Sequence, residues 1–171
     1  MKSIPGLHTM LAFHLDHDQN TKALALLDNW LKDNPDDLAT LTDKGQLLSR
    51  LKRHDEAVEV YQSALEFANS QEESNLISMV AATYTEKGDF KEALKSIDDA
   101  IDRTGGDNFI FQKATIYMKM DQHGDAIELF NDLLDDNPNH EEILLNRAES
   151  HMALKQYDLA KGDFSTLQSF A

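Results

Sequence analysis

Cysteine is absent from the 171 residues, and long apolar runs are absent as well. The lack of cysteine excludes disulfides, thiolate nucleophiles and cysteine-ligated metal. No stretch approaches the ~20 apolar residues that a membrane-spanning helix needs. The first ten residues contain no continuous apolar segment of the kind found in signal peptides. We therefore expect a soluble, cytoplasmic protein.

Positive charge is also scarce, because 16 Lys and Arg residues face 31 Asp and Glu residues, for a net charge of −15. A polyanion repels phosphate backbones and anionic lipid headgroups, so we expect neither nucleic acid nor membrane as a partner. The charge favours a partner protein with a basic segment. The alternative is that the charge serves only to keep a helical protein soluble.

Catalytic motifs and complete metal-binding motifs are missing too. The segment 16–20 begins like a calcium loop, but Thr21 and Leu27 replace the glycine and the bidentate glutamate that such a loop requires. His14 and His17 have a spacing that could seat zinc, although a packed structural role suits His14 better. No Ser–His–Asp order, glycine-rich phosphate loop or H-E-x-x-H occurs. We predict no enzymatic activity, no cofactor and no metal.

What is present is a repeat, marked by an alanine that recurs at intervals of 34, 36, 33 and 34 residues. These marker alanines are Ala23, Ala57, Ala93, Ala126 and Ala160. A large apolar residue precedes each of them, at Leu7, Leu41, Ile77, Ile110 and Leu144. Four residues after this apolar residue, every repeat but the first has a small residue. The residues in this slot are Leu11, Gly45, Ala81, Ala114 and Ala148. Small residues at these slots let two antiparallel helices approach closely.

The pattern resembles the tetratricopeptide repeat (TPR) family, with its motif W-x2-L-G-x2-Y…A-x3-F…P and its period of about 34 residues. The resemblance implies an all-α fold: an α-solenoid of about five helix–turn–helix repeats forming a right-handed superhelix with a concave groove. We predict a single array over residues 1–171, with repeats near 4–37, 38–71, 74–106, 107–140 and 141–171. Lys44, Lys113 and Arg147 depart from the motif, which has leucine in their slot, so only their methylene stems are expected to pack.

The predicted first helices run near 5–16, 38–51, 74–87, 107–120 and 141–154. The predicted second helices run near 20–33, 54–68, 90–103, 123–136 and 157–169. Because the period stretches to 36 residues at Asn69–Ser74, this segment is predicted to be a longer turn.

The resemblance also implies that the first helices line a groove that binds an extended peptide or a helix of another protein. We therefore predict a protein–protein interaction scaffold or adaptor; the alternative is a small acidic TPR chaperone that holds a client. Subtracting the core slots from the first helices leaves a further stripe at spacing four then three. The predicted partner-binding residues are this stripe and adjacent amides: Thr42, Gln46, Asn75, Ser78, Ala82, Thr85, Asn108, Phe111, Gln112, Thr115, Met118, Glu149 and Met152.

Two expectations concern apolar residues near the C-terminal end. Phe111 is left open between a hydrophobic anchor for a partner and a core residue, whereas Leu145 is expected in the core. An exposed apolar patch is expected at His151, Leu154, Tyr157, Phe164, Leu167 and Phe170. Such a patch is expected to be covered by a continuation of the chain, by a partner or by a second copy of the chain. Of these we favour a homodimer through the C-terminal repeat. The paired cations that grip a C-terminal carboxylate in some TPR co-chaperones are absent, so that function is not expected.

Overall fold

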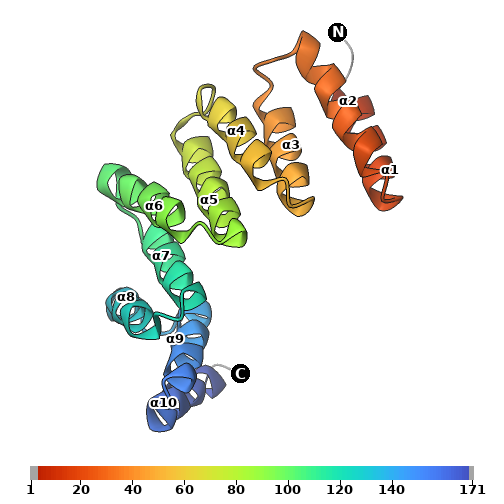
Figure 1. Ribbon diagram of the computed structural model, residues 1–171. Coiled ribbons are helices and arrows are strands. Elements are labelled where there is room, and N and C mark those ends of the chain that lie inside the picture. The colour runs from red at the N-terminus through yellow and green to blue at the C-terminus, as the bar shows by residue number, and fades with distance from the viewer. Residues whose placement is uncertain (1–3, 170–171) are drawn as a thin grey trace. The chain divides into compact units, whose positions relative to one another are not determined.

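A computed structural model describes residues 4–169, which form ten α-helices and no strand (Figure 1). The first helices of the repeats are α1 (Ile4–Asp16), α3 (Leu38–Arg50), α5 (Ser70–Lys87), α7 (Asp107–Lys119) and α9 (Glu141–Ala153). The second helices are α2 (Asn20–Asp33), α4 (His54–Leu65), α6 (Phe90–Thr104), α8 (His123–Asp136) and α10 (Tyr157–Gln168). The predicted all-α architecture of helix pairs is confirmed.

The chain divides into two compact units, Met1–Lys87 and Gly88–Ala171. The first unit contains α1 to α5 and the second contains α6 to α10. The division falls at the turn inside the third repeat rather than between repeats. That all five repeats act as one array remains a prediction.

The marker alanines are among the most deeply buried positions of both units. Each has an exposed fraction of 1% or less. Four residues further on, Leu27, Tyr61, Ile97 and Phe130 are also almost fully buried. Alanine at the first position leaves room for the paired helix, and the large side chain one turn later fills the space beside it. These two slots therefore form the core in the first four repeats, whereas Phe164, in the large slot of the fifth, is 37% exposed.

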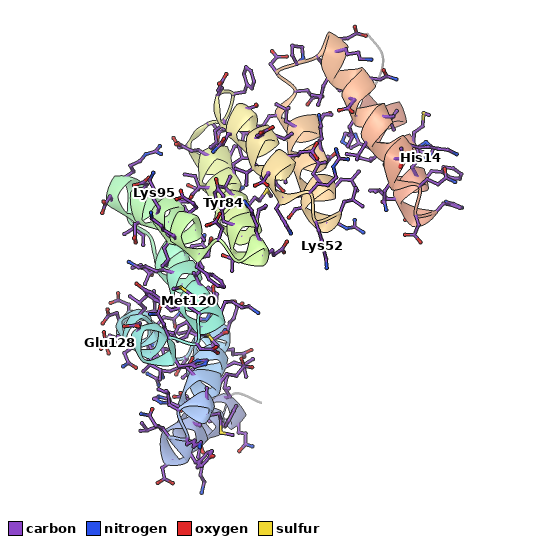
Figure 2. The ribbon with its side chains drawn as sticks, viewed as in Figure 1. His14, Lys52, Tyr84, Lys95, Met120 and Glu128 are labelled. Atoms are coloured by element: carbon purple, nitrogen blue, oxygen red, sulfur yellow. The ribbon has the colours of Figure 1, made fainter. Side chains whose placement is uncertain are left out.

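The turn inside every repeat has one residue in the left-handed region of backbone conformation. These residues are Asp18, Lys52, Gly88, Asp121 and Lys155, with φ angles from 53° to 85°. Lys52 marks the turn between α3 and α4 in Figure 2. Asp18 belongs to the segment that begins like a calcium loop, and that segment is the turn between α1 and α2. Among residues 4–169, no group of three or more His, Asp or Glu side chains is placed to hold a metal ion.

The longer turn predicted at Asn69–Ser74 is wrong, because α5 already begins at Ser70. Asn69 accepts hydrogen bonds from the backbone N–H groups of Gln71 (3.0 Å) and Glu72 (3.1 Å). The Glu72 carboxylate in turn accepts one from the backbone N–H of Asn69, at 2.9 Å. This reciprocal pair is a capping box, which satisfies the N–H groups at a helix start and here extends the helix by one turn.

The three cations in the leucine slot do more than pack their stems. Lys44 pairs with Asp28 (2.7 Å) and Lys113 pairs with Asp98 (2.7 Å). In both cases the acid follows the marker alanine of the preceding repeat by five residues. The hydrogen bond to Asp98 raises the pKa of Lys113, although partial burial opposes the shift. The departure from the motif therefore gives a regular polar contact between successive repeats.

Arg147 occupies the same slot in the last repeat and makes three hydrogen bonds. One, of 2.7 Å, reaches Asn131 at the equivalent position of the preceding repeat. The other two form a fork on the carboxylate of Asp163 in α10, at 3.1 and 2.6 Å. Asp163 is only 5% exposed. The guanidinium therefore neutralises a buried charge, which the two lysines do not.

The lone tryptophan, Trp30, links the first two repeats. Its indole N–H donates to the Asp37 carboxylate at 2.6 Å, and that carboxylate also accepts from the hydroxyl and N–H of Thr40 at the start of α3. Burial raises the pKa of Asp37, but these hydrogen bonds outweigh it, so the pKa lies below 3.8. The ionised carboxylate therefore stabilises the fold above that pH, and the contribution is lost as the pH falls through the lowered pKa.

Candidate protein-interaction surface

We call the residues at spacing four then three on the first helices the first-helix stripe. In the first unit its predicted members are Thr42 and Gln46 on α3, and Ser78, Ala82 and Thr85 on α5. Gln46 and Ala82 are exposed, whereas the three hydroxyl residues are half-buried. Each of these hydroxyls donates to a backbone carbonyl four residues earlier, at 2.7 to 3.0 Å. Their oxygens can accept hydrogen bonds from a ligand, but their protons are already engaged.

Thr42 lines a hollow of about 350 Å³, together with side chains from α1, α3 and α5. We call this the first hollow. Its lining residues are His8, Leu38, Ala39, Thr42, Asp43, Glu72, Asn75, Leu76 and Met79. The predicted residue Asn75 lies here as well, and its exposed side chain forms no hydrogen bond with any residue from 4 to 169. The hollow therefore brings two predicted binding residues together.

Sequence reasoning missed the acidic side chains of this hollow. Asp43 lies one position off the stripe and has a half-buried carboxylate 3.9 Å from the imidazole of His8. Burial raises the pKa of Asp43, His8 acts in the opposite direction, and Asp37 raises it further. Glu72 belongs to the α5 capping box. The available signals were the place of Glu72 in the first turn of α5 and that of Asp43 beside Thr42 on α3.

In the second unit the stripe divides between core and surface. Phe111 and Met118 on α7 are half-buried against the core, and the Phe111 ring centroid lies 5.9 Å from that of Phe130. Leu145 and Met152 on α9 are 44% and 46% exposed. The prediction that Leu145 lies in the core is wrong, because the adjacent Leu144 fills the core position and turns Leu145 outward.

The remaining predicted residues of the second unit surround these side chains. Glu149 is exposed between Leu145 and Met152 on α9. Gln112 and Thr115 on α7 are half-buried, and the Thr115 hydroxyl donates to the Gln112 carbonyl at 2.8 Å. The surface of α9 is therefore apolar at both ends of its stripe and acidic in the middle.

A second hollow, of about 290 Å³, contains the exposed Asn108 and one edge of Phe111. It is also lined by Asp107, His140 and Glu142, among others. Asn108 and Phe111 occupy the repeat positions that Ala39 and Thr42 occupy in the first hollow. Each unit therefore has a hollow near the N-terminal ends of neighbouring first helices, lined by a carboxamide, carboxylates and an imidazole. Phe111 is both a core residue and part of this surface.

The expected C-terminal patch is found in part. Leu154, Tyr157 and Phe164 are 42%, 58% and 37% exposed, and Leu159, which was not predicted, is 56% exposed. His151 is buried and its ring nitrogen lies 2.7 Å from the Gln156 side-chain oxygen, so including it in the patch was wrong. Leu167 packs half-buried against the core of the second unit. Phe170 lies outside the described residues.

His14 makes the same kind of contact as His151, although it is half-buried and not buried. Its imidazole lies 3.0 Å from the side-chain oxygen of Gln19, also five residues further along the chain. His14 is labelled in Figure 2. This contact agrees with the packed structural role expected for His14.

Comparison with known proteins agrees with this repeat geometry. One tetratricopeptide repeat family model matches residues 14–72, and another tetratricopeptide repeat model matches residues 117–162. Together the two matches cover more than half of the chain. The chain belongs to the tetratricopeptide repeat family.

Solved structures show the same fold. A MamA fragment from Desulfovibrio magneticus is 16% identical, with coverage of 95% of this chain and 92% of that one, at a TM-score of 0.70. A tetratricopeptide repeat protein from Parabacteroides merdae is 21% identical, with coverage of 96% and 65%, at a TM-score of 0.71. These likenesses confirm an all-α TPR solenoid.

One curated protein is also similar, the peptidyl-prolyl cis-trans isomerase FKBP4 of Mus musculus. It is 27% identical over 131 residues, which cover 67% of this chain and 28% of that protein. The chain therefore spans less than a third of that relative. Family membership supports a general role as a protein-interaction scaffold, and the family is generally non-enzymatic. None of the helices formed by residues 4–169 is both long and apolar enough to cross a membrane.

Proposed function

We propose that this TPR chain is an adaptor that binds an extended peptide or a helix of a partner protein along the first-helix stripe of both units. The observation that carries the proposal is the pair of hollows, because each contains a residue predicted from the sequence to bind a ligand and an exposed carboxamide. A carboxamide both donates and accepts hydrogen bonds, so Asn75 and Asn108 suit the backbone of a bound segment. Leu145 and Met152 supply apolar area on α9.

Replacing Asn75, Asn108 and Phe111 together by alanine is expected to weaken partner binding at least tenfold. The change removes two free carboxamides and one aromatic edge while it leaves the marker alanines intact. The partner is first recovered by pull-down and mass spectrometry, and its affinity for the full chain is then measured by calorimetry. Far-UV circular dichroism tests whether the triple variant keeps its helicity.

A matched triple variant, with Gln62, Phe67 and Asn139 replaced by alanine, changes the same chemistry outside the stripe and both hollows. It should bind as the unmodified chain does. Equal affinity of the stripe variant and the unmodified chain would refute the proposal. Recovery of many unfolded proteins, in place of one stoichiometric partner, would favour the chaperone alternative.

We also propose that the partner segment is basic. The most acidic repeat, residues 107–140, contains Asp107, Asp121, Asp125, Glu128, Asp132, Asp135 and Asp136. Association with a basic segment should slow several-fold between about 20 mM and about 150 mM salt, because mobile ions screen charges separated by more than about 8 Å at the higher concentration. Stopped-flow association with the recovered partner measures this rate. An association rate that does not change with salt would contradict the basic partner segment. The negative charge of the chain would then serve only solubility.

A homodimer through the C-terminal repeat is a further proposal about partners. It is supported by four large apolar side chains that are exposed in the last repeat, those of Leu154, Tyr157, Leu159 and Phe164. Exposed apolar area favours association between protein surfaces. We expect light scattering to give twice the chain mass at high micromolar concentration. Replacing Tyr157 and Leu159 by serine should restore the monomer mass. A monomeric mass for the unmodified chain at that concentration would contradict the dimer.

A further inference from the structure

The first hollow has an apolar floor below an acidic rim. Leu76 is 2% exposed, and the half-buried Leu38 and Met79 lie beside it. Asp43 and Glu72 supply the carboxylates of the rim. A volume of about 350 Å³ corresponds to roughly ten water molecules, so one long side chain of a bound segment fits. The occupant therefore has to suit both an apolar surface and negative charge.

The two carboxylates are held in place without a strong cationic partner. Glu72 is fixed by the hydrogen bond of 2.9 Å from the backbone N–H of Asn69. Asp43 is 35% exposed at its side chain, and its ion-pair partner is the imidazole of His8 at 3.9 Å. No lysine or arginine among residues 4–169 forms an ion pair with either carboxylate. Burial without such a partner disfavours the charged form of Asp43, consistent with its raised pKa.

Three classes of occupant do not fit this chemistry. A wholly apolar side chain would remove water from both carboxylates and give no hydrogen bond in return. An anion would be repelled by both carboxylates. A metal ion would find too few ligands, because no group of three His, Asp or Glu side chains is placed to hold one in the part of the chain that the structure describes.

We propose that the first hollow takes a lysine or arginine side chain of the partner segment, with its methylene stem on Leu38, Leu76 and Met79 and its cation between Asp43 and Glu72. Long cationic side chains cover apolar surface with their stems while the charged end remains at a polar edge. Asn75, at the same rim, pairs with the backbone beside the inserted residue. This inference rests on the proposed function and specifies the residue type that the first unit recognises.

The test uses the full chain, labelled with ¹⁵N, and acetylated, amidated pentapeptides of sequence Gly-Ala-X-Ala-Gly. X is lysine, arginine, Nε-acetyl-lysine, norleucine or glutamate. We expect lysine or arginine to shift the amide signals of residues 38–43 and 72–79 and to bind at least fivefold more tightly than norleucine or acetyl-lysine. Equal shifts with lysine, arginine and norleucine would refute the charge recognition. A lysine or arginine peptide that leaves these signals unmoved would refute the site.

Matched variants separate the hollow from general charge attraction. Asp43→Asn with Glu72→Gln should weaken binding of the cationic peptides at least fivefold. The double variant Asp55→Asn and Glu59→Gln removes two exposed acids of α4 and should change binding less than twofold. Ala39→Phe keeps every charge but fills the hollow, and it should also abolish binding. Equal losses with the α4 variant and the rim variant would refute the proposal, as would unchanged binding by Ala39→Phe.

The outcome is separable from that of the proposed function. If the stripe variant loses the recovered partner but no cationic peptide binds the first hollow, the adaptor role stands and this inference fails. If the cationic peptides bind the first hollow but the stripe variant keeps its partner, the hollow recognises cations and the stripe proposal fails.

Discussion

Replacing Arg147 by alanine is expected to lower the free energy of unfolding by about 3–5 kcal/mol, the cost of leaving a buried charge without its partner. The guanidinium forks onto Asp163 with hydrogen bonds of 3.1 and 2.6 Å, and Asp163 is 5% exposed. Alanine removes both hydrogen bonds and leaves Asp163 to ionise in a poorly hydrated place. The third hydrogen bond, to Asn131, would be lost as well.

Urea denaturation followed by far-UV circular dichroism measures this change. Fluorescence is unsuitable because the lone tryptophan belongs to the first unit, whereas Arg147 belongs to the second. Asp163→Asn with Arg147→Met removes both charges and should recover most of the loss. No recovery in this double variant would show that the unpaired charge of Asp163 is not the source of the loss.

The lysines of the same slot supply a control within the chain. Lys44→Ala and Lys113→Ala should each cost less than about 1 kcal/mol, because their partners Asp28 and Asp98 have side chains that are 52% and 48% exposed and water screens such pairs. Three equal losses would mean that the slot, and not the burial of Asp163, determines the effect.

Much of the fold was predictable because the marker alanines recur at a nearly constant interval. The marker alanine of each repeat marks the place where its two helices pack closely. The ends of most helices could therefore be predicted to within a few residues by counting from that alanine. The start of α5 was not predicted correctly. The interval of 36 residues between marker alanines shows that this repeat has two residues more than the usual 34, but it does not show whether they lengthen a turn or a helix. The capping box of Asn69 and Glu72 places them in the helix, and its spacing was visible in the sequence.

The candidate surface was predictable only along the helices. The stripe and its adjacent amides brought Thr42 and Asn75 to the first hollow, and Phe111 and Asn108 to the second. Asp43 and Glu72 were missed because their convergence with His8 depends on how three successive first helices pack. The spacing of residues along a single helix does not show which side chains of neighbouring helices meet. The ion pairs of Lys44 and Lys113 were missed for the same reason, since each acid belongs to the preceding repeat.

Gly45→Ala is the second substitution with a large expected effect, although alanine occupies the same slot in three other repeats. An added Cβ would lie 2.7 Å from Cδ1 and 2.8 Å from Cζ of Tyr61, closer than real side chains approach. Tyr61 is 2% exposed, so its ring has little room to move away. We expect a loss of about 1–3 kcal/mol from overpacking, reduced by up to about 1 kcal/mol because alanine favours a helix over glycine.

Gly162→Ala isolates the helix preference from the clash. Gly162 lies inside α10, and a Cβ there would meet no atom within 4 Å. This variant should gain about 0.5–1 kcal/mol, whereas Gly45→Ala should lose stability. Trp30 fluorescence during urea denaturation follows the first unit, whereas circular dichroism follows the helices of both units, so a change seen only by circular dichroism belongs to the second. Tyr61→Leu should relieve most of the loss in a chain that already has Gly45→Ala, because the shorter side chain leaves space for the new methyl group. If Gly45→Ala gains stability as Gly162→Ala does, the α3–α4 contact yields to a methyl group and close approach is not why this repeat has glycine.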